Sequence, residues 1–193
     1  MASTPATFPV ATGVITWAGG GAITWGGTGN IYALDAAYAT AGFGIPAALV
    51  SYFLGTYNYG FAGAGLVPAG ATIDGVILKV EHKASGAGVI ESDMRFYADA
   101  TAGTGGTATN LSAAAAIPTS DTAKDYGSSS APQGLSAAIV RGANFGGGVR
   151  YKNTSFMGRT VSVDAHGITV YYTPAPSAPG AYFRTQQNLL EAA

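Results

Sequence analysis

The sequence carries little charge. Asp, Glu, Lys and Arg together make up 10% of its 193 residues, and the formal net charge is −1. An average soluble domain has roughly 25% charged residues. A phosphate-binding surface needs clustered Lys and Arg, and the nine basic residues of this chain are scattered. We therefore expect no nucleic-acid partner, and so poorly charged a surface favours association with other subunits over a free monomer.

Cysteine is absent, and long apolar runs are absent too. Without cysteine there can be no disulfide framework and no cysteine metal site, so stability must come from packing or oligomerisation. The longest apolar stretch, Phe43 to Leu54, is interrupted by Gly44 and Pro46 and is shorter than the roughly 20 residues that span a bilayer. The first residues lack the basic and apolar segments of a signal peptide. We expect synthesis in the cytoplasm and no membrane partner.

Glycine and alternating strands are abundant. The 29 glycines and the 48% hydrophobic content favour many short strands joined by turns. The clearest strand lies in Val67 to Lys83, where Val76, Leu78 and Val80 share one face. Its expected partner is Val161 to Thr173, which repeats the alternation. The sequence predicts an all-β protein: an antiparallel β-sandwich of jelly-roll type with extended terminal arms.

The two expected central strands carry the only histidines, His82 and His166. The alternation of the second strand changes phase near Gly167, so we expect a β-bulge there. We place both histidines on solvent-facing positions. If they met across the sheet with Asp164 or Glu81, a metal site or an acid/base pair would be conceivable, but no further ligand is suitably spaced.

Other catalytic patterns are missing from the sequence. It has no Gly-x-Ser-x-Gly elbow, no Walker phosphate loop and no His-Glu-x-x-His helix. We therefore predict a protein that is not an enzyme, with no catalytic residues, no cofactor and no metal.

The remaining chain predicts shorter elements. Listed in order, they are a hairpin over Ile15 to Trp25, a buried strand or short buried helix over Ile45 to Leu54, a strand over Val89 to Asp99, a long loop over Thr101 to Gly134 with at most one short strand around Thr107 to Leu111, and a helical turn or strand edge over Leu135 to Arg141. We divide the chain into an N-terminal arm or hairpin (1–28), a sandwich domain (29–173), and a Pro-rich linker with a C-terminal arm (174–193).

Aromatic and apolar residues outside the expected core are candidates for contact with partners. Trp17, Trp25, Tyr57 and Tyr59 could form a stacking platform for a sugar or another chain; packing at the end of the sandwich or in its core is the alternative. The C-terminal arm carries four apolar residues beyond a stiff Pro-rich linker, and we expect it to dock on a neighbouring subunit. These arm residues are Tyr182, Phe183, Leu189 and Leu190.

Three stretches share a recognisable pattern: GNIYALDAAYATA (29–41), VPAGATIDGV (67–76), and Asn144-Phe145-Gly146 together with VDAHGITVYY (163–172). Together they resemble a loosely defined group of tailed-bacteriophage virion proteins. The chain departs from the group at Gly147 and Gly148, where members have a more regular strand. The resemblance spans Gly29 to Thr173, and its motifs are structural rather than catalytic.

The resemblance implies a structural role in a virion, with partners that include other virion proteins. We expect a homo-oligomer, for which a trimer is one arrangement, located in the virion. The leading interpretation is a capsid decoration (cement) protein that binds the major capsid protein through sandwich and arm contacts. The alternative is a tail or fibre component that acts as a carbohydrate- or receptor-binding module.

Overall fold

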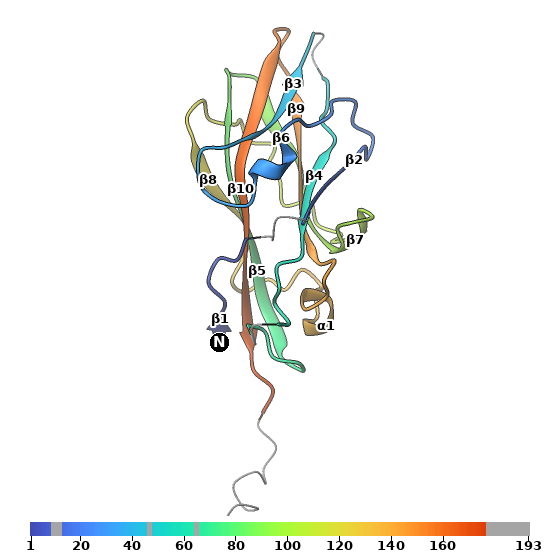
Figure 1. The fold of residues 1–193 in the computed structure, drawn as a ribbon, viewed down its shortest axis with the longest axis vertical. Coiled ribbons are helices and arrows are strands. Elements are labelled where there is room, and N and C mark those ends of the chain that lie inside the picture. The colour runs from blue at the N-terminus through green and yellow to red at the C-terminus, as the bar shows by residue number, and fades with distance from the viewer. Residues whose placement is uncertain (9–12, 46–47, 64–65, 177–193) are drawn as a thin grey trace, which may run out of the picture.

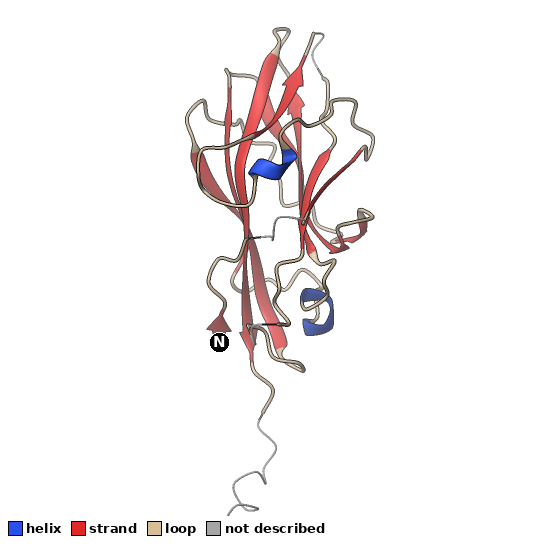
Figure 2. Cartoon of the chain, in the orientation of Figure 1, coloured by secondary structure: helices blue, strands red, loops and turns tan. Residues whose placement is uncertain are grey.

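The computed structural model describes residues 1–8, 13–45, 48–63 and 66–176. Two antiparallel sheets of five strands each pack face to face (Figures 1 and 2). Sheet A contains β1 (Ala2–Ser3), β3 (Ala39–Phe43), β5 (Thr72–Ala84), β8 (Thr122–Ser128) and β10 (Arg159–Thr173). Sheet B contains β2 (Val14–Trp17), β4 (Phe53–Tyr57), β6 (Val89–Asp99), β7 (Thr104–Gly106) and β9 (Gly146–Asn153). The predicted all-β, jelly-roll-like sandwich is confirmed.

The two strands with the clearest alternation form the centre of sheet A. β5 and β10 pair antiparallel along nearly their whole length, with Leu78 opposite Ile168 and Val76 opposite Val170. All four of these side chains are fully buried between the sheets. Because side chains alternate along a strand, the pairing fixes which residues of both strands face the core.

The bulge in β10 lies at Asp164 and not at Gly167. Val163 pairs with His82 and Ala165 pairs with Glu81, so Asp164 is the extra residue. A bulge shifts the alternation by one residue, and His166 therefore points into the core. His82 also points inward, and the two histidines are 0–1% exposed. The predicted bulge position and the predicted solvent-facing histidines are both wrong.

The N-terminal half enters both sheets rather than folding locally. β2 pairs with β4, whereas Ile23 forms a bridge to Ser51, so the predicted hairpin over Ile15 to Trp25 does not form. The apolar run from Ile45 to Leu54 is not one element either. Among its described residues, Val50 and Ser51 form only isolated bridges, and β4 begins at Phe53.

The segment predicted as a long loop contributes two strands. β8 pairs with β5 at the edge of sheet A, and β7 pairs with β6 at the edge of sheet B. The short strand expected around Thr107 to Leu111 is absent, since those residues form no strand. Leu135 to Arg141 does contain a helical turn, α1 (Ala137–Val140), and a second short helix, η1 (Thr28–Asn30), precedes β3.

The N-terminus extends sheet A along β10. Beyond the β1 pairing, the backbone N–H groups of Thr4 and Thr7 donate to the carbonyl oxygens of Val170 and Ile168, each at 2.9 Å. β9 runs through Gly147 and Gly148 as a regular strand, paired on both sides. The division of the chain at residues 28 and 173 stays a prediction.

Candidate functional site

Four aromatic side chains gather on the outer face of sheet B. In β4, Leu54 and Thr56 face the core, so Phe53 and Tyr57 point outward by alternation. Trp17 lies opposite Phe53 on β2, and Tyr97 projects from β6, whose inward residues are Met94 and Phe96. Trp17, Phe53, Tyr57 and Tyr97 form a cluster separate from the main core. We call this cluster the aromatic face.

Glycines on the same side of the sheet make room for the tryptophan. Gly55 and Gly148 lie opposite each other on β4 and β9. A Cβ atom on Gly55 would lie 2.1 Å from Cζ3 of Trp17, and one on Gly148 would lie 2.9 Å from its Cη2. Real Cβ atoms do not approach so closely, so the indole can lie on the sheet only because both positions are glycine.

The rings are arranged in an orderly way. Trp17 and Phe53 are stacked, with centroids 5.0 Å apart and planes 9° from parallel. Tyr97 meets both rings edge-on, at 5.1 Å from Trp17 and 6.0 Å from Phe53. Phe53 and Tyr97 are each only 5% exposed, whereas Trp17 and Tyr57 are half-buried. The accessible surface of the cluster is therefore mainly that of Trp17 and Tyr57.

Charged side chains border the aromatic face. Asp93 of β6 accepts from Nε of Arg95 at 2.7 Å, and its other oxygen lies 3.6 Å from Arg150 of β9. The Arg150 guanidinium sits 4.6 Å from the ring centroid of Phe53, within the range of a cation–π contact. Burial, and then the nearby carboxylate of Asp93, raise the pKa of Tyr97 to about 12, so its hydroxyl remains protonated at neutral pH.

This arrangement can bind but offers no evident reacting group. A flat apolar ring surface beside planar Arg and Asp side chains can take the face of an amphipathic ligand and hydrogen-bond its polar edge. Among the residues that the structure describes, no group of three or more His, Cys, Asp and Glu side chains could hold a metal ion.

The structure separates the four predicted platform residues into two pairs. Trp17 and Tyr57 lie on the aromatic face, but Trp25 and Tyr59 are core residues, 9% and 4% exposed. Trp25 donates from Nε1 to the carbonyl oxygen of Tyr52 at 2.8 Å. The Tyr59 hydroxyl lies 2.6 Å from Oγ1 of Thr56, and burial raises its pKa well above its usual value. These two residues therefore pack in the core and are not part of the aromatic face.

The other four contact candidates, Tyr182, Phe183, Leu189 and Leu190, lie outside the described residues. Sequence reasoning missed Tyr97, Arg150 and Asp93 as members of the site. The alternation of β6 places Tyr97 on the face of the sheet away from Phe96. This alternation is the signal that could have identified Tyr97 as a member of the site. Arg150 had no comparable signal. It reaches Phe53 and Asp93 only because β9 lies between β4 and β6 in the sheet, and that pairing cannot be read from the local sequence.

The two histidines are ordinary core residues. Nδ1 of His82 lies 3.0 Å from the Tyr151 hydroxyl, and Nδ1 of His166 lies 3.2 Å from Oγ1 of Thr56. Burial lowers the pKa of His82 to about 4 and, with a further contribution from His82, that of His166 to about 3. Both rings are therefore neutral at pH 7. Neither hydrogen-bonds with Asp164 or Glu81, the acidic residues considered as partners for a metal or acid/base site.

Comparisons with known proteins give information about the fold of this chain and not about its function. No protein-family model matches the chain, and no characterised protein sequence matches it. Similar solved structures include a CBM4 structure, at 10% identity and a TM-score of 0.40, with 81% of this chain and 94% of that chain covered. The CBM22-1 xylan-binding domain of Xyn10C from Paenibacillus barcinonensis shares 11% identity at a TM-score of 0.43, with 90% and 95% covered.

A third similar structure is an arabinose-bound α-L-arabinofuranosidase, with 10% identity and a TM-score of 0.40; the match covers 86% of this chain and 25% of that one. At these identities and scores the similarities carry no argument about what this chain binds. As for membranes, none of the helices in the described part of the chain has the length and apolar character of a membrane span.

Proposed function

We propose that this chain is a non-enzymatic component of a phage particle, of the tail or fibre type, whose sandwich binds carbohydrate through the aromatic face of sheet B. The virion context rests on the resemblance of residues 29–173 to tailed-phage virion proteins. The binding role is supported by one observation: Trp17 and Tyr57 lie on one sheet face together with Phe53, Tyr97 and a bordering Arg–Asp–Arg group.

Carbohydrate fits this face better than a purely apolar ligand. A sugar ring presents an apolar C–H face and a hydroxylated edge, so it can lie against a half-buried aromatic ring while its hydroxyls meet polar side chains. Arg95 and Arg150 supply donors in a fixed planar geometry, and Asp93, which is only 7% exposed, orients them from below. The ion pairs with Asp93 hold both guanidinium groups in place before a ligand arrives, which reduces the entropy lost on binding.

The test is binding to a glycan array, followed by calorimetry with any glycan that binds. Trp17→Ala and Tyr57→Ala should each weaken binding by roughly tenfold or more, as for central aromatic contacts elsewhere. Phe156→Ala is the matched control, because Phe156 is an exposed aromatic (83%) outside the aromatic face; it should bind as the wild type does. Absence of any glycan binding, or equal loss in the control, would refute the proposal.

Thermal unfolding must accompany these measurements, since Trp17 packs on Phe53 and Tyr97. Arg95→Ala adds a variant outside the ring stack: the Arg95 side chain is 30% exposed and donates to Asp93 and to the carbonyl oxygens of Thr107 and Ala108, so its loss removes a donor at the border of the aromatic face. If Arg95→Ala keeps the melting temperature of the wild type and still weakens glycan binding, loss of fold is not the cause.

A capsid decoration protein is the second candidate, favoured by an exposed apolar tip. Ile45, Phe156 and Met157 are 71%, 83% and 62% exposed. The pairing of Phe43 with Arg159 brings the β3 end and the β9–β10 turn together, at the end of the sandwich away from the N-terminus (Figure 1). Exposed apolar groups gathered in this way are typical of protein-contact sites, and the major capsid protein is the occupant that this function requires.

Sedimentation of the protein with purified capsids tests the second candidate. Phe156→Ser with Met157→Ser should abolish co-sedimentation while leaving glycan binding unchanged, because the tip and the aromatic face are separate. Unchanged co-sedimentation of the double variant would exclude the tip as the capsid contact. Light scattering of the free protein reports whether it is a homo-oligomer.

A further inference from the structure

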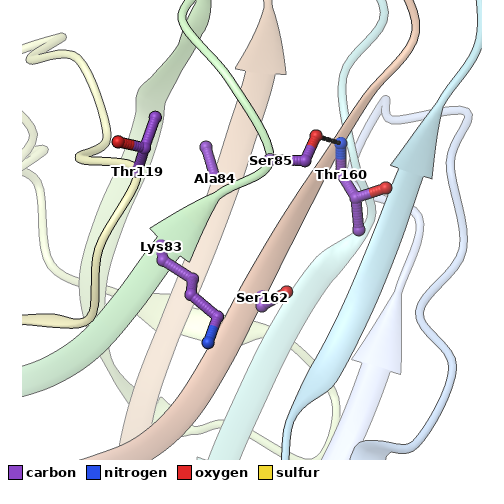
Figure 3. A pocket seen from close by; sticks show the side chains of 6 residues that line it. All are labelled: Lys83, Ala84, Ser85, Thr119, Thr160 and Ser162. Carbon is purple, nitrogen blue, oxygen red and sulfur yellow. Dashed lines mark hydrogen bonds between the residues drawn. The ribbon is translucent and has the colours of Figure 1, made fainter.

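A second concave site lies on the opposite sheet. A pocket with a volume of about 380 Å³ opens on the outer face of sheet A and is lined by residues of β5, β10 and two loops (Figure 3). The aromatic face belongs to the other sheet. It lies where β5 ends beside the start of β10. Its lining residues are Lys83, Ala84, Ser85, Thr119, Thr160 and Ser162. None of them belongs to the site already described.

The pocket exists because the outward residues at this end of sheet A are small. Ser162 lies between Lys83 on β5 and Thr40 on β3, and Thr160 lies opposite Gly42. A Cβ atom at Gly42 would meet nothing within 4 Å. Strands β5 and β10 form the floor of the hollow, and the loops that carry Ser85 and Thr119 complete its rim.

The lining is rich in hydroxyl groups that retain hydrogen-bonding capacity for a ligand. Ser85 Oγ accepts from the backbone N–H of Thr160 at 2.9 Å, which leaves its own proton free to donate. The hydroxyls of Thr119, Thr160 and Ser162 form no hydrogen bond with any residue that the structure describes. Each hydroxyl can donate one hydrogen bond and accept others. The pocket therefore offers both donors and acceptors to a ligand.

Lys83, the charged residue among those that line the pocket, is already ion-paired. Lys83 Nζ donates to Asp121 Oδ2 at 3.0 Å and lies 3.9 Å from the ring centroid of Tyr38. The same carboxylate oxygen accepts from the Tyr38 hydroxyl at 3.0 Å. Contacts with Tyr38 and Asp121 raise the pKa of Lys83. An anionic ligand would have to compete with Asp121, whereas an uncharged ligand can use the remaining Lys83 protons without breaking the ion pair.

We propose that this pocket binds one neutral, hydroxyl-rich ring, a single monosaccharide unit. Its volume is at the small end of the roughly 300–1,000 Å³ of small-molecule sites, which suits one ring rather than a chain. Mixed donors and acceptors match sugar hydroxyls, and the carboxylate of Asp121 would compete with phosphate or a carboxylate ligand for Lys83. The inference goes beyond the proposed function and does not depend on it, because the pocket shares no residue with the aromatic face.

Saturation-transfer NMR with the full chain tests this site. The probes are glucose, galactose, mannose and N-acetylglucosamine, with glucuronate and inorganic phosphate as charged comparators. Thr160→Val removes a hydroxyl at nearly constant volume, and Ser162→Val also fills the hollow; both should weaken binding of the neutral sugar by at least tenfold. Thr169→Val is the matched control, since Thr169 is a half-buried threonine of the same strand outside the pocket.

The outcomes separate this inference from the proposed function. Loss of monosaccharide binding in Thr160→Val and Ser162→Val, with Thr169→Val and Trp17→Ala unchanged, supports the pocket whatever the glycan array shows. The pocket inference is overturned if no neutral monosaccharide binds, if glucuronate or phosphate binds more tightly, or if both pocket variants bind like the wild type. Loss of glycan binding in Trp17→Ala, together with unchanged monosaccharide binding in both pocket variants, would keep the aromatic face and exclude the pocket.

Discussion

Glu91 is an acidic side chain in the core, only 1% exposed. Its carboxylate accepts from the Tyr126 hydroxyl at 2.8 Å and from the backbone N–H of Ala113 at 3.2 Å, and it pairs with the ammonium of Lys124. Burying a charge is costly unless it is paired and hydrogen-bonded. Here β6 supplies the acid and β8 supplies two of its partners, so the group links the two sheets.

Glu91→Ala should lower the free energy of unfolding by about 2–4 kcal/mol, somewhat less than the roughly 3–5 kcal/mol seen when a fully buried pair is broken. The expected loss of stability is smaller than for a fully buried pair because the side chain of Lys124 is 36% exposed. Glu81→Ala, on the partly exposed outer side of β5, is the control and should cost less than about 0.5 kcal/mol. Urea unfolding measures both; equal effects would contradict the structural role of Glu91.

The histidines show where residue-scale prediction fails. In β5, His82 continues the series Val76, Leu78 and Val80, so alternation alone points it inward; its polarity suggested solvent instead. What permits burial is the Tyr151 hydroxyl on the facing sheet, which no local pattern reveals. For His166 the error came from the position of the bulge. One extra residue at Asp164 reverses which side chains of the following part of β10 point into the core.

At the scale of elements, the glycines of β4 and β9 determine how the aromatic face can pack on the sheet. Gly55 and Gly148 let Trp17 lie on the sheet, and Gly146 leaves space for the carbonyl oxygen of Thr56, which a Cβ atom would approach to 1.6 Å. In most strands such glycines would be costly, since they add no packing surface. In this sheet they set the position of the indole.

Gly55→Ala should displace Trp17, because the new methyl group would occupy the place of the indole ring. We expect a loss of roughly 1–3 kcal/mol of stability, typical of overpacking, a changed near-ultraviolet circular dichroism signal and weaker glycan binding. Gly42→Ala is the control: it adds the same methyl group to β3 in open space. An unchanged tryptophan signal in Gly55→Ala would show that the indole does not depend on this glycine.

Elements with one buried face were predictable, and edge elements were not. β5, β6 and β10 have clear alternation, and all three were predicted with their facing largely correct. β8, with the sequence TAKDYGS, buries only Tyr126 and is otherwise polar on both faces. A strand held mainly by backbone pairing with β5 carries no hydrophobic period, so its sequence resembles that of a loop.

At the scale of the whole molecule, pairing between distant segments decides the topology. The echo Ile15-Thr16-Trp17 and Ile23-Thr24-Trp25 suggests a local hairpin, but Trp17 pairs with Phe53 and Ile23 with Ser51. A hairpin would leave both tryptophans on one small ribbon, whereas the sandwich places Trp25 in the core and Trp17 on the aromatic face. The two copies of the Ile-Thr-Trp pattern therefore occupy different environments, because burial in the tertiary structure outweighs local strand propensity.

The stability of the whole molecule should fall as the pH is lowered from 7.5 to 5. In the unfolded chain a histidine has a pKa near 6.5, whereas burial lowers the pKa of His82 to about 4 and that of His166 to about 3. Between these values the unfolded state binds protons that the folded state does not, so acid favours unfolding. The loss should be on the order of 1–2 kcal/mol for each histidine at pH 5.

Urea unfolding at pH 7.5, 6.5, 5.8 and 5.0, a range in which unperturbed carboxylates are still mostly ionised, measures this dependence. His166→Gln removes one titrating group, so the slope of unfolding free energy against pH should fall to about half, assuming equal shares for the two histidines, even if the variant is less stable at pH 7.5. Because the slope and the absolute stability are separate quantities, loss of the Thr56 contact alone cannot imitate the result. An unchanged slope in His166→Gln would mean that His166 is not held neutral by burial.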